Sequence, residues 1–393
     1  MLPPFHHPLL GNHPPLLTPI EHFLTHLRLD HLTHLTHKPA DRVIGTKRKN
    51  LRPKSLANTF IREPFPCIVN DAKDSLMTQS SPSISRRRFF AISSAATAAV
   101  SLNPRTLCAQ QPPAQDFLTR ARAANANNKI TATPLRRNIT FLGGAGGNIA
   151  VLTSKEGKLL VDSGYSSCQP QLTAALAAIN ADPIQVLINT HWHFDHTDGN
   201  DWMHSAGATI WAHENTRYRM SSTQNIVAYK AIIPPAPTGA LPTILFNSYR
   251  TLSDGTNTLK LTHYEPAHTD TDLSVHFTEA NILHCGDTFW NGFYPFIDYS
   301  SGGNINGMVQ ATEQNLTTAA ADTIIIPGHG PLGNKAQLTE FHDMLVTIRD
   351  NVAKLKKEGK SLDESIAAKP TAAFDEKWGK KPDAFIGYVY QGV

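Results

Sequence analysis

The run Thr190-His191-Trp192-His193-Phe194-Asp195-His196 is the stretch around which this sequence predicts its fold. Its last six residues hold three histidines and one aspartate. The apolar, β-branched run 185–189 before it predicts a buried strand, and the polar run 197–200 after it predicts a turn. Alternate side chains of an extended segment point to one side, so His191 and His193 can hold one metal ion while Asp195 and His196 turn toward a second. Imidazoles with a carboxylate are ligands that suit zinc.

Length, charge and cysteine content set limits on the class of protein. The chain has 393 residues, enough for one large domain or two average ones. Its formal net charge of +4 gives no case for nucleic-acid binding. Its four cysteines show no C-x-x-C spacing, so we expect neither a thiolate zinc site nor a disulfide framework. No apolar run reaches the length of a membrane span, so we expect no stable membrane anchor.

Residues 1–76 differ in composition from the rest of the chain. They hold eight of its 19 histidines and many prolines, and they show no helix or strand periodicity. A His-rich tract can bind metal. The missing core pattern favours instead a disordered extension, or a gene start placed upstream of the true one at Met77.

Residues 77–109 follow the plan of a signal peptide. A polar start leads to Arg86-Arg87-Arg88, an apolar stretch at 89–102 and the small residue Ala109, where cleavage can occur. The run 85–90 resembles the twin-arginine export motif. That resemblance implies export through the Tat machinery, so we expect a periplasmic or secreted protein.

The folded domain is expected at residues 130–345, after a linker at 110–129 that carries a short helix around residues 117–124. Apolar periods and turn residues predict a hairpin at 148–161, a helix at 171–179, a strand at 208–212 and a helix at 213–220. This alternation indicates an α/β or α+β class in which helices cover the sheets.

Residues 346–393 predict C-terminal helices and a tail. Asn334 is the expected N-cap of a long amphipathic helix whose apolar residues recur every three or four positions from Leu338 to Leu355. Ser361 opens a shorter helix with a capping box. We expect this region to be structural.

Three further candidate ligands lie where predicted strands end. His268, Asp287 and His329 each come shortly after an apolar run that reads as a strand. Glycines beside Asp287 and His329 let the backbone turn sharply and approach an ion closely. One rim of a sheet can therefore gather these three residues with the four ligand candidates of the opening run.

In combination, these residues resemble the metallo-β-lactamase superfamily. The opening run is similar to the T-H-x-H-x-D-H motif of that family, and Asp162, His268, Asp287 and His329 match the other motif positions in order. The resemblance implies an α+β fold, the αββα four-layer sandwich, with a two-metal site at one edge of the paired sheets.

The resemblance also implies a role for each matched residue. It places His191, His193 and His268 on the first metal, Asp195, His196 and His329 on the second, and Asp287 between the two. Asp162 is implied to support the histidine loop without binding metal.

Departures within the family narrow the expected chemistry. Asp287 stands where the cysteine-containing β-lactamases carry cysteine. An aspartate at this position resembles the glyoxalase II-type hydrolases. The nearby Cys285 is expected to be a small buried residue. His193 stands where the flavodiiron branch carries glutamate, which favours two zinc ions over the alternatives, iron and manganese.

The expected function is an exported metal-dependent hydrolase with a small-molecule substrate. A metal-bridging hydroxide, oriented or deprotonated by Asp195, would cleave an ester, thioester, lactone or amide. The alternative is an iron-dependent redox enzyme similar to persulfide dioxygenases. The sequence names neither the substrate nor the oligomeric state.

Several residues near the motifs have two interpretations each. Trp192, Phe194, Trp290, Phe293 and Tyr294 could form a hydrophobic wall for the substrate or pack in the core. His284 could contact the ligands from behind or be an ordinary packed histidine. The Pro-rich segment 234–239 could belong to a lid or be a plain connector.

Overall fold

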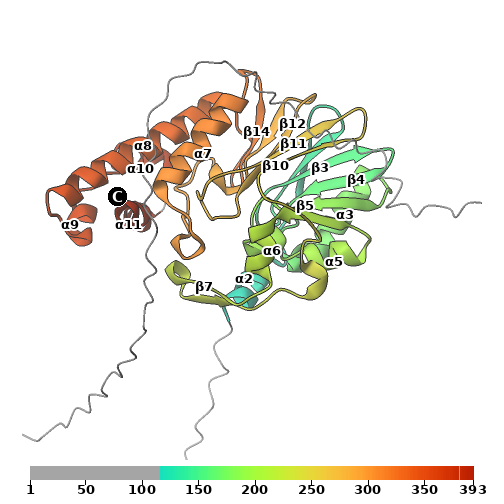
Figure 1. Cartoon of the computed structure of the whole chain (residues 1–393), viewed down its shortest axis with the longest axis horizontal. Helices are drawn as coiled ribbons and strands as arrows, with labels where there is room; N and C mark the ends of the chain where they lie inside the picture. The colour runs from blue at the N-terminus through green and yellow to red at the C-terminus, as the bar shows by residue number, and fades with distance from the viewer. Residues whose placement is uncertain (1–115, 380) are drawn as a thin grey trace, which may run out of the picture. The chain divides into compact units, whose positions relative to one another are not determined.

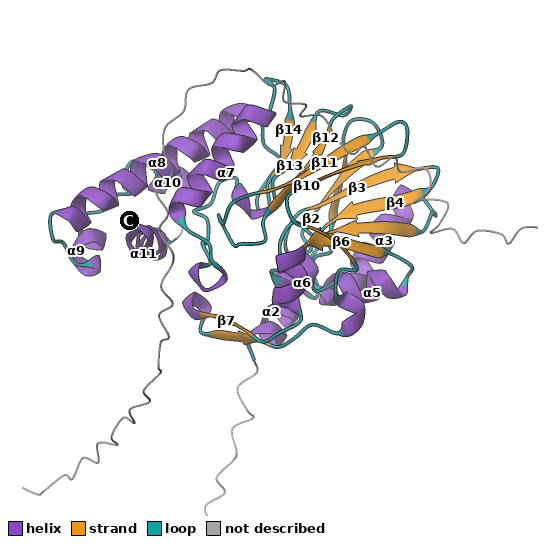
Figure 2. Cartoon of the chain, viewed as in Figure 1, coloured by secondary structure: helices purple, strands orange, loops and turns teal. Residues whose placement is uncertain are grey.

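The computed structural model describes residues 116–379 and 381–393. The predicted extension, the predicted signal peptide and the start of the predicted linker lie outside the described residues. The described part of the chain is built on two β-sheets that pack face to face, with helices over their outer faces (Figure 1, Figure 2). This is the predicted α+β sandwich of four layers. None of the helices in the described ranges combines the length and apolar character needed to cross a membrane.

The first sheet has seven strands in the order β1-β2-β3-β4-β5-β6-β9. The strands up to β4 pair antiparallel, and the pairs from β4 to β9 are parallel. Parallel neighbours need a crossover, which α3 and α5 provide here. The bounds are β1 (Thr131–Pro134), β2 (Ile139–Gly143), β3 (Ile149–Ser154), β4 (Gly157–Val161), α3 (Gln169–Ile179), β5 (Ile184–Ile188), α5 (Asn200–Ser205), β6 (Thr209–His213) and β9 (Ile244–Phe246).

The second sheet has five strands in the order β10-β11-β12-β13-β14. Its last pair is parallel, and α7 forms the crossover between β13 and β14. A separate two-stranded hairpin is formed by β7 and β8. The bounds are β7 (Gln224–Ile226), β8 (Ala231–Ile233), β10 (Tyr249–Ser253), β11 (Thr258–His263), β12 (Leu273–Phe277), β13 (Ile282–His284), α7 (Ile305–Thr318) and β14 (Ile324–Ile326).

Successive residues of the central strands pack into different layers. In β4, Leu159 and Val161 pack between the two sheets, whereas Leu160 packs against the layer that contains α3. All five residues of β4 are buried, because both faces of this sheet are covered. This explains why the central strands read as continuous apolar runs rather than as an alternation. The predicted hairpin, helix and strands of residues 148–220 are confirmed within one or two residues at their ends.

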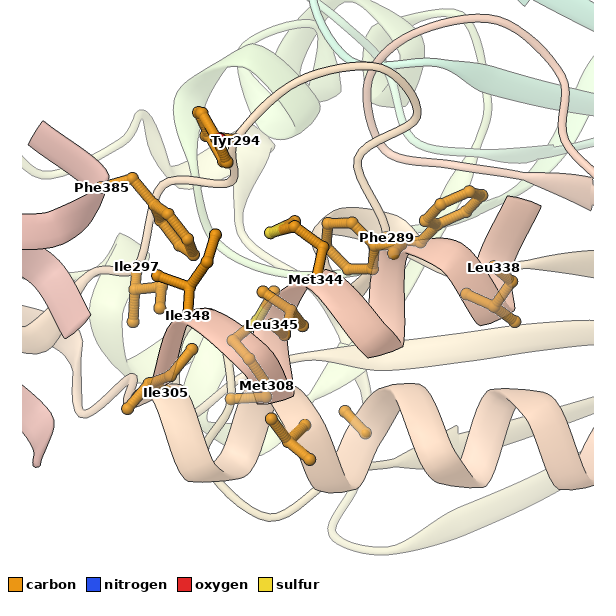
Figure 3. Packing of buried hydrophobic residues seen from close by; sticks show 14 of the residues in the cluster. Phe289, Tyr294, Ile297, Ile305, Met308, Leu338, Met344, Leu345, Ile348 and Phe385 are labelled. Carbon is orange, nitrogen blue, oxygen red and sulfur yellow. The ribbon is translucent and has the colours of Figure 1, made fainter. Parts of the chain in front are cut away.

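The C-terminal helices share the core of the second sheet. The long helix α8 (Lys335–Lys357) begins at Asn334 with a capping box, as predicted, and α9 (Leu362–Ala367) has the predicted capping box at Ser361. Two more helices follow, α10 (Asp375–Trp378) and α11 (Pro382–Gly392). Figure 3 shows Phe385 of α11 beside Ile348 of α8, in one buried cluster. The domain boundary predicted after residue 345 therefore falls inside α8, because the apolar face of that helix continues to Val352.

The segment predicted as a linker carries the predicted short helix, α2 (Phe117–Asn125). Asp116 caps it by accepting a hydrogen bond from the Thr119 backbone N–H. The ring of Phe117 meets the ring of Phe194 edge to face at 5.6 Å, and the Arg122 guanidinium donates to the Asp198 carboxylate. The helix is thus held against the domain by an aromatic contact and an ion pair.

A stacked pair of histidines joins the ends of two strands from different sheets. The rings of His213, at the end of β6, and His263, at the end of β11, are 3.6 Å apart and nearly parallel. Nε2 of His213 lies 3.2 Å from the backbone carbonyl oxygen of Asn247, and Nδ1 of His263 lies 2.9 Å from that of Asp272. Burial, and to a smaller extent the neighbouring ring of His213, lowers the pKa of His263 to about 4. Burial also lowers the pKa of His213.

We expect this pair to make the protein less stable in mild acid. The unfolded chain protonates an imidazole near its ordinary pKa of about 6.5, whereas folded His263 resists protonation down to about pH 4. Between these values the unfolded state binds more protons, so stability falls as the pH drops. His263→Asn removes this effect and should flatten the fall by about 1–2 kcal/mol, after allowance for the exposed part of the ring.

The measurement is the free energy of unfolding in urea at pH 7.5 and pH 4.5. His204→Asn is the matched control, because His204 lies on α5 away from the pair. If the wild type and His263→Asn lose equal stability over this interval, the stacked pair has no such effect.

Candidate metal centre

The seven side chains predicted as ligands meet at one edge of the two sheets. Four come from the segment after β5, and the others come from the loop after β11 and from the ends of β13 and β14. They form two groups, in each of which the potential ligand atoms all lie within 4.8 Å of one another. The first group is His191, His193, His268 and Asp287, and the second is Asp195, His196 and His329.

The segment after β5 is not extended throughout, which corrects one prediction. A short helix, α4 (Phe194–Thr197), begins directly after His193, so the predicted turn at 197–200 starts earlier. The backbone N–H and the hydroxyl of Thr197 both donate to the carbonyl of His193 and close this helical turn. Because of the turn, Asp195 and His196 face the second group, while His191 and His193 face the first.

Asp287 lies between the two groups. Its Oδ2 atom is 3.3 Å from Nε2 of His268 and 3.9 Å from Nε2 of His191. The same carboxylate reaches the second group, with Oδ1 3.2 Å from Nε2 of His196 and Oδ2 3.4 Å from Nε2 of His329. One buried carboxylate is therefore within reach of both groups.

Asp195 closes the second group on its more open side. Its Oδ2 atom is 3.2 Å from Nε2 of His329 and 3.8 Å from Nε2 of His196. The side chains of Asp195 and His329 are 19% and 21% exposed, whereas the imidazole of His196 is fully buried. The second group is thus the part of the centre that solvent or a substrate can reach.

Hydrogen bonds fix the tautomers of the first group. Nδ1 of His268 lies 2.8 Å from the carbonyl oxygen of Phe296, and Nε2 of His193 lies 3.0 Å from the Asp298 carboxylate. Both acceptors lack protons, so these nitrogens are the donors. The remaining nitrogens, Nε2 of His268 and Nδ1 of His193, then carry lone pairs, and they face each other at 2.9 Å.

The same reasoning applies to His191 and His196. The Asp162 carboxylate accepts from Nδ1 of His196 and from the hydroxyl of Thr190. Because that hydroxyl has given its proton to Asp162, it accepts from Nδ1 of His191 at 3.0 Å. In the neutral form of both histidines, Nε2 therefore carries a lone pair that points into the centre.

This arrangement fits a metal ion. The lone pairs of His191, His193 and His268 converge on the space of the first group, where those of His193 and His268 would repel each other at 2.9 Å without a cation. Nε2 of His191 and Oδ1 of Asp287 are buried without a hydrogen-bond partner among the described residues. Unprotonated imidazole nitrogens with carboxylate oxygens are the donor set that zinc prefers.

The charges of the two groups differ. Burial lowers the pKa of His191 and lowers that of His268 to about 4, so these two imidazoles of the first group are neutral. In the second group, burial also lowers the pKa of each imidazole, but the carboxylates of Asp287 and Asp195 outweigh burial. The pKa of His196 is therefore raised, and that of His329 is raised to about 9. These carboxylates need positive charge beside them, and protons and metal ions compete for the same nitrogens.

Asp162 supports the histidine loop from behind, in the position the sequence predicted. Its backbone adopts a left-handed conformation, with φ of 68°, directly after β4. Its carboxylate accepts hydrogen bonds from the backbone N–H and hydroxyl of Thr190 and from His196, at 2.7–2.8 Å. It lies behind the imidazoles and is in neither group of potential ligands.

Two glycines allow the backbone to approach the centre. A Cβ atom at Gly147 would overlap the imidazole of His196, and one at Gly328 would overlap Oδ1 of Asp287.

Cys285 is fully buried, as predicted. His284 is buried with Nε2 3.2 Å from the carbonyl of Asn148, so it is a packed histidine outside both groups.

Asp298 is a functional residue that the sequence analysis missed. It is buried, and it accepts from Nε2 of His193 and from the hydroxyls of Ser300 and Ser301. Burial raises the pKa of its carboxyl, but the hydrogen bonds from His193 and the serines outweigh burial and hold the pKa below its ordinary value. The local signal is an Asp-x-Ser turn, which indicates a turn and says nothing of a histidine 105 residues away.

The aromatic residues near the motifs divide between the two interpretations. Trp192 is 2% exposed and packs in a core cluster. Phe194 and Trp290 line a cavity of about 160 Å³ that opens onto the centre and that His193, Asp195, Asp287 and His329 also line. The Pro-rich segment 234–237 lines a different cavity, of about 460 Å³, beside Trp192 and Phe194.

Comparison with known proteins agrees with this geometry. The sequence pattern of the metallo-beta-lactamase superfamily matches residues 142–334. This segment, which contains Asp162 and all seven clustered residues, belongs to that superfamily.

A curated relative and two solved structures show how far the likeness extends. A hydroxyacylglutathione hydrolase of Polaromonas sp. (strain JS666 / ATCC BAA-500) is 26% identical over 169 residues, which are 42% of this chain and 56% of that protein. The chain thus spans little more than half the length of this relative. The stereoselective inverting sec-alkylsulfatase Pisa1 from Pseudomonas sp. is 17% identical, with a TM-score of 0.52, over 70% of this chain and 51% of that one. The DIM-1 metallo-beta-lactamase is 20% identical, with a TM-score of 0.45, over 56% of this chain and 98% of that one. The likeness to the sulfatase shows the fold alone.

We expect Asp298→Ala to weaken metal binding about 10–100-fold, because His193 would lose the partner that fixes its tautomer and ring orientation. Asp298→Asn keeps an acceptor but loses the charge, so its loss should be smaller. The measurement is a competition titration of zinc against a chromogenic chelator, with thermal unfolding as the check on folding. Equal zinc affinity in the wild type and both variants would show that Asp298 does not act on the metal centre.

Proposed function

We propose that this protein is a hydrolase that depends on two zinc ions and cleaves an ester, thioester, lactone or amide bond of a small molecule. The observation that carries the proposal is the set of inward-facing lone pairs on four imidazoles around one shared carboxylate, Asp287. The name of the curated relative, a hydroxyacylglutathione hydrolase, supports hydrolysis. Iron and manganese are the alternative metals.

The chain would hold the two ions with separate residues. His191, His193 and His268 would hold the first ion, and Asp195, His196 and His329 the second. Asp287 would contribute to both sites, since its carboxylate oxygens lie within 3.4 Å of histidines in each group. Bound zinc ions would supply Lewis acidity, lowering the pKa of a water molecule and polarising the bond to be cleaved.

Asp195 is proposed as the residue that orients the attacking water. Its carboxylate is partly exposed toward the cavity over the centre. Burial raises the pKa of Asp195, but His196 and His329 outweigh burial and lower it to about 2. A carboxylate with so low a pKa is a poor base, so Asp195 would act mainly by accepting a hydrogen bond from the water.

Two aromatic side chains would exclude bulk water from this space. The ring of Trp290 lies 4.4 Å from that of His329, and the ring of Phe296 lies 5.9 Å from that of His193. Their apolar surfaces lower the local dielectric constant, which would strengthen the attraction between bound zinc ions and the negative charge that develops on the substrate oxygen.

His193→Ala should reduce hydrolysis at least 100-fold and lower the zinc content, because it removes a ligand from the first group. The measurement combines metal analysis of the purified protein with assays on chromogenic esters, thioesters, lactones and cephalosporins. His342→Ala on α8 is the matched control, since its side chain pairs with Glu313 and Asp343 at the surface.

About two zinc ions per wild-type chain, with activity that a chelator abolishes and zinc restores, would support the proposal. One iron per chain with oxygen consumption would overturn it in favour of the redox alternative. Full activity of metal-free His193→Ala would refute the centre itself.

We also propose that the protein is exported through the twin-arginine route. The support is the sequence of residues 77–109, which lies outside the described residues. Sequencing the N-terminus of the mature protein from its native host should give a start near residue 110. A mature protein that begins at Met1 would contradict both the export and a true gene start at Met77.

A further inference from the structure

We infer that the substrate carries a long apolar group, such as a medium-length alkyl chain, that lies in an aromatic channel leading away from the metal centre. The inference rests on the proposed function, because it places the bond to be cleaved at the centre. The channel is formed by the loop around residues 290–296, by η2 (Val227–Tyr229) and by the C-terminal helices.

The channel is a hollow of about 440 Å³ that shares three lining residues, Tyr229, Trp290 and Phe296, with the 160 Å³ cavity over the metal centre. Phe296 lies at the junction. Its ring is 5.9 Å from that of His193 on one side and 5.3 Å from that of Tyr388 on the other.

Aromatic rings continue along the channel beyond this junction. The ring of Tyr229 lies 4.5 Å from that of Phe296, and the rings of Tyr294 and Phe385 stack at 5.0 Å. Lys381, the N-cap of α11, and Tyr388 within that helix both line the channel and lie seven residues apart. At the rise of a helix this corresponds to about 10 Å, which suits a chain of several methylene groups.

The lining is poor in charge. Lys381 is the one residue with a formal charge among the described residues that line the hollow. A substrate with several charges along this path would leave them without partners, at a cost in binding free energy. An alkyl or aromatic group instead exchanges water for ring surfaces and gains free energy with each methylene group buried.

Two aromatic side chains that line the channel are partly open to solvent. Phe293 is 46% exposed and Tyr229 is 40% exposed. Exposed apolar surface beside a hollow can be covered by an apolar ligand.

Five of the twelve residues that line the channel lie outside the segment that matches the superfamily. Trp378, Phe385 and Tyr388 follow residue 334, where the superfamily match ends. The inferred preference therefore depends in part on the C-terminal helices of this chain.

The test compares p-nitrophenyl acetate with p-nitrophenyl octanoate on the purified, zinc-loaded protein. One buried methylene is worth about fourfold in affinity at most, so we expect kcat/KM for the octanoyl ester to exceed that for the acetyl ester at least tenfold. Ala384→Trp fills the channel from an exposed position on α11. It should reduce kcat/KM for the octanoyl ester about tenfold and leave that for the acetyl ester within twofold.

Two further variants control this comparison. Asp383→Trp adds the same bulk at the neighbouring exposed position of α11, which does not line the hollow, and should change neither value. Ala228→Trp fills the channel from the opposite wall and should reproduce the effect of Ala384→Trp. Circular dichroism verifies the folding of each variant.

A binding measurement separates this inference from the proposed hydrolysis. Calorimetric titration with octanoate and acetate should give at least tenfold tighter binding of octanoate, and Ala384→Trp should abolish that difference. If octanoate binds in this way but no ester is hydrolysed, the inference stands and the proposed ester chemistry fails. If both esters are hydrolysed equally well and Ala384→Trp affects both alike, hydrolysis stands and the apolar channel is refuted. Equal binding of the two carboxylates also refutes it.

Discussion

Four imidazole rings at the edge of the two sheets share one constraint, because each donates the proton of its outward nitrogen to a fixed oxygen. Those oxygens belong to Asp162, Asp298, Thr190 and the Phe296 backbone, and they leave the inward nitrogens as lone pairs. The mutual repulsion of those lone pairs is relieved when a cation lies among them. The left-handed backbone at Asp162, the close approach of two glycines and the burial of Asp298 all serve this arrangement.

The clustering of the candidate ligands could be predicted from the sequence because each follows a strand. Strand ends at one edge of a sheet lie close together, so an apolar run before His268, Asp287 or His329 carries information on where the side chain lies. The N-caps at Asn334 and Ser361 were predictable for a similar reason, since a capping box is a local pattern.

The parts that could not be predicted depend on contacts between distant segments. Asp298 acts on a histidine 105 residues earlier, and no local pattern encodes that pairing. The helical turn of α4 within the histidine run also escaped prediction, because its four residues are too few to show a period. The aromatic residues of α10 and α11 read as an ordinary packed face, and only their position beside Trp290 and Phe296 gives them a role.

The metal centre draws its residues from both sheets. The four ligands after β5 belong to the first sheet, whereas Asp287 and His329 follow strands of the second. The distances between the two halves are therefore set by the apolar layer between the sheets, where Val161, Ile188, Leu261 and Val275 are buried. A substitution in that layer that slides one sheet by a fraction of an ångström would separate the donors without touching any of them. Packing in the interior between the sheets therefore also sets the spacing of the candidate metal ligands, and with it the size of the ion that they can hold.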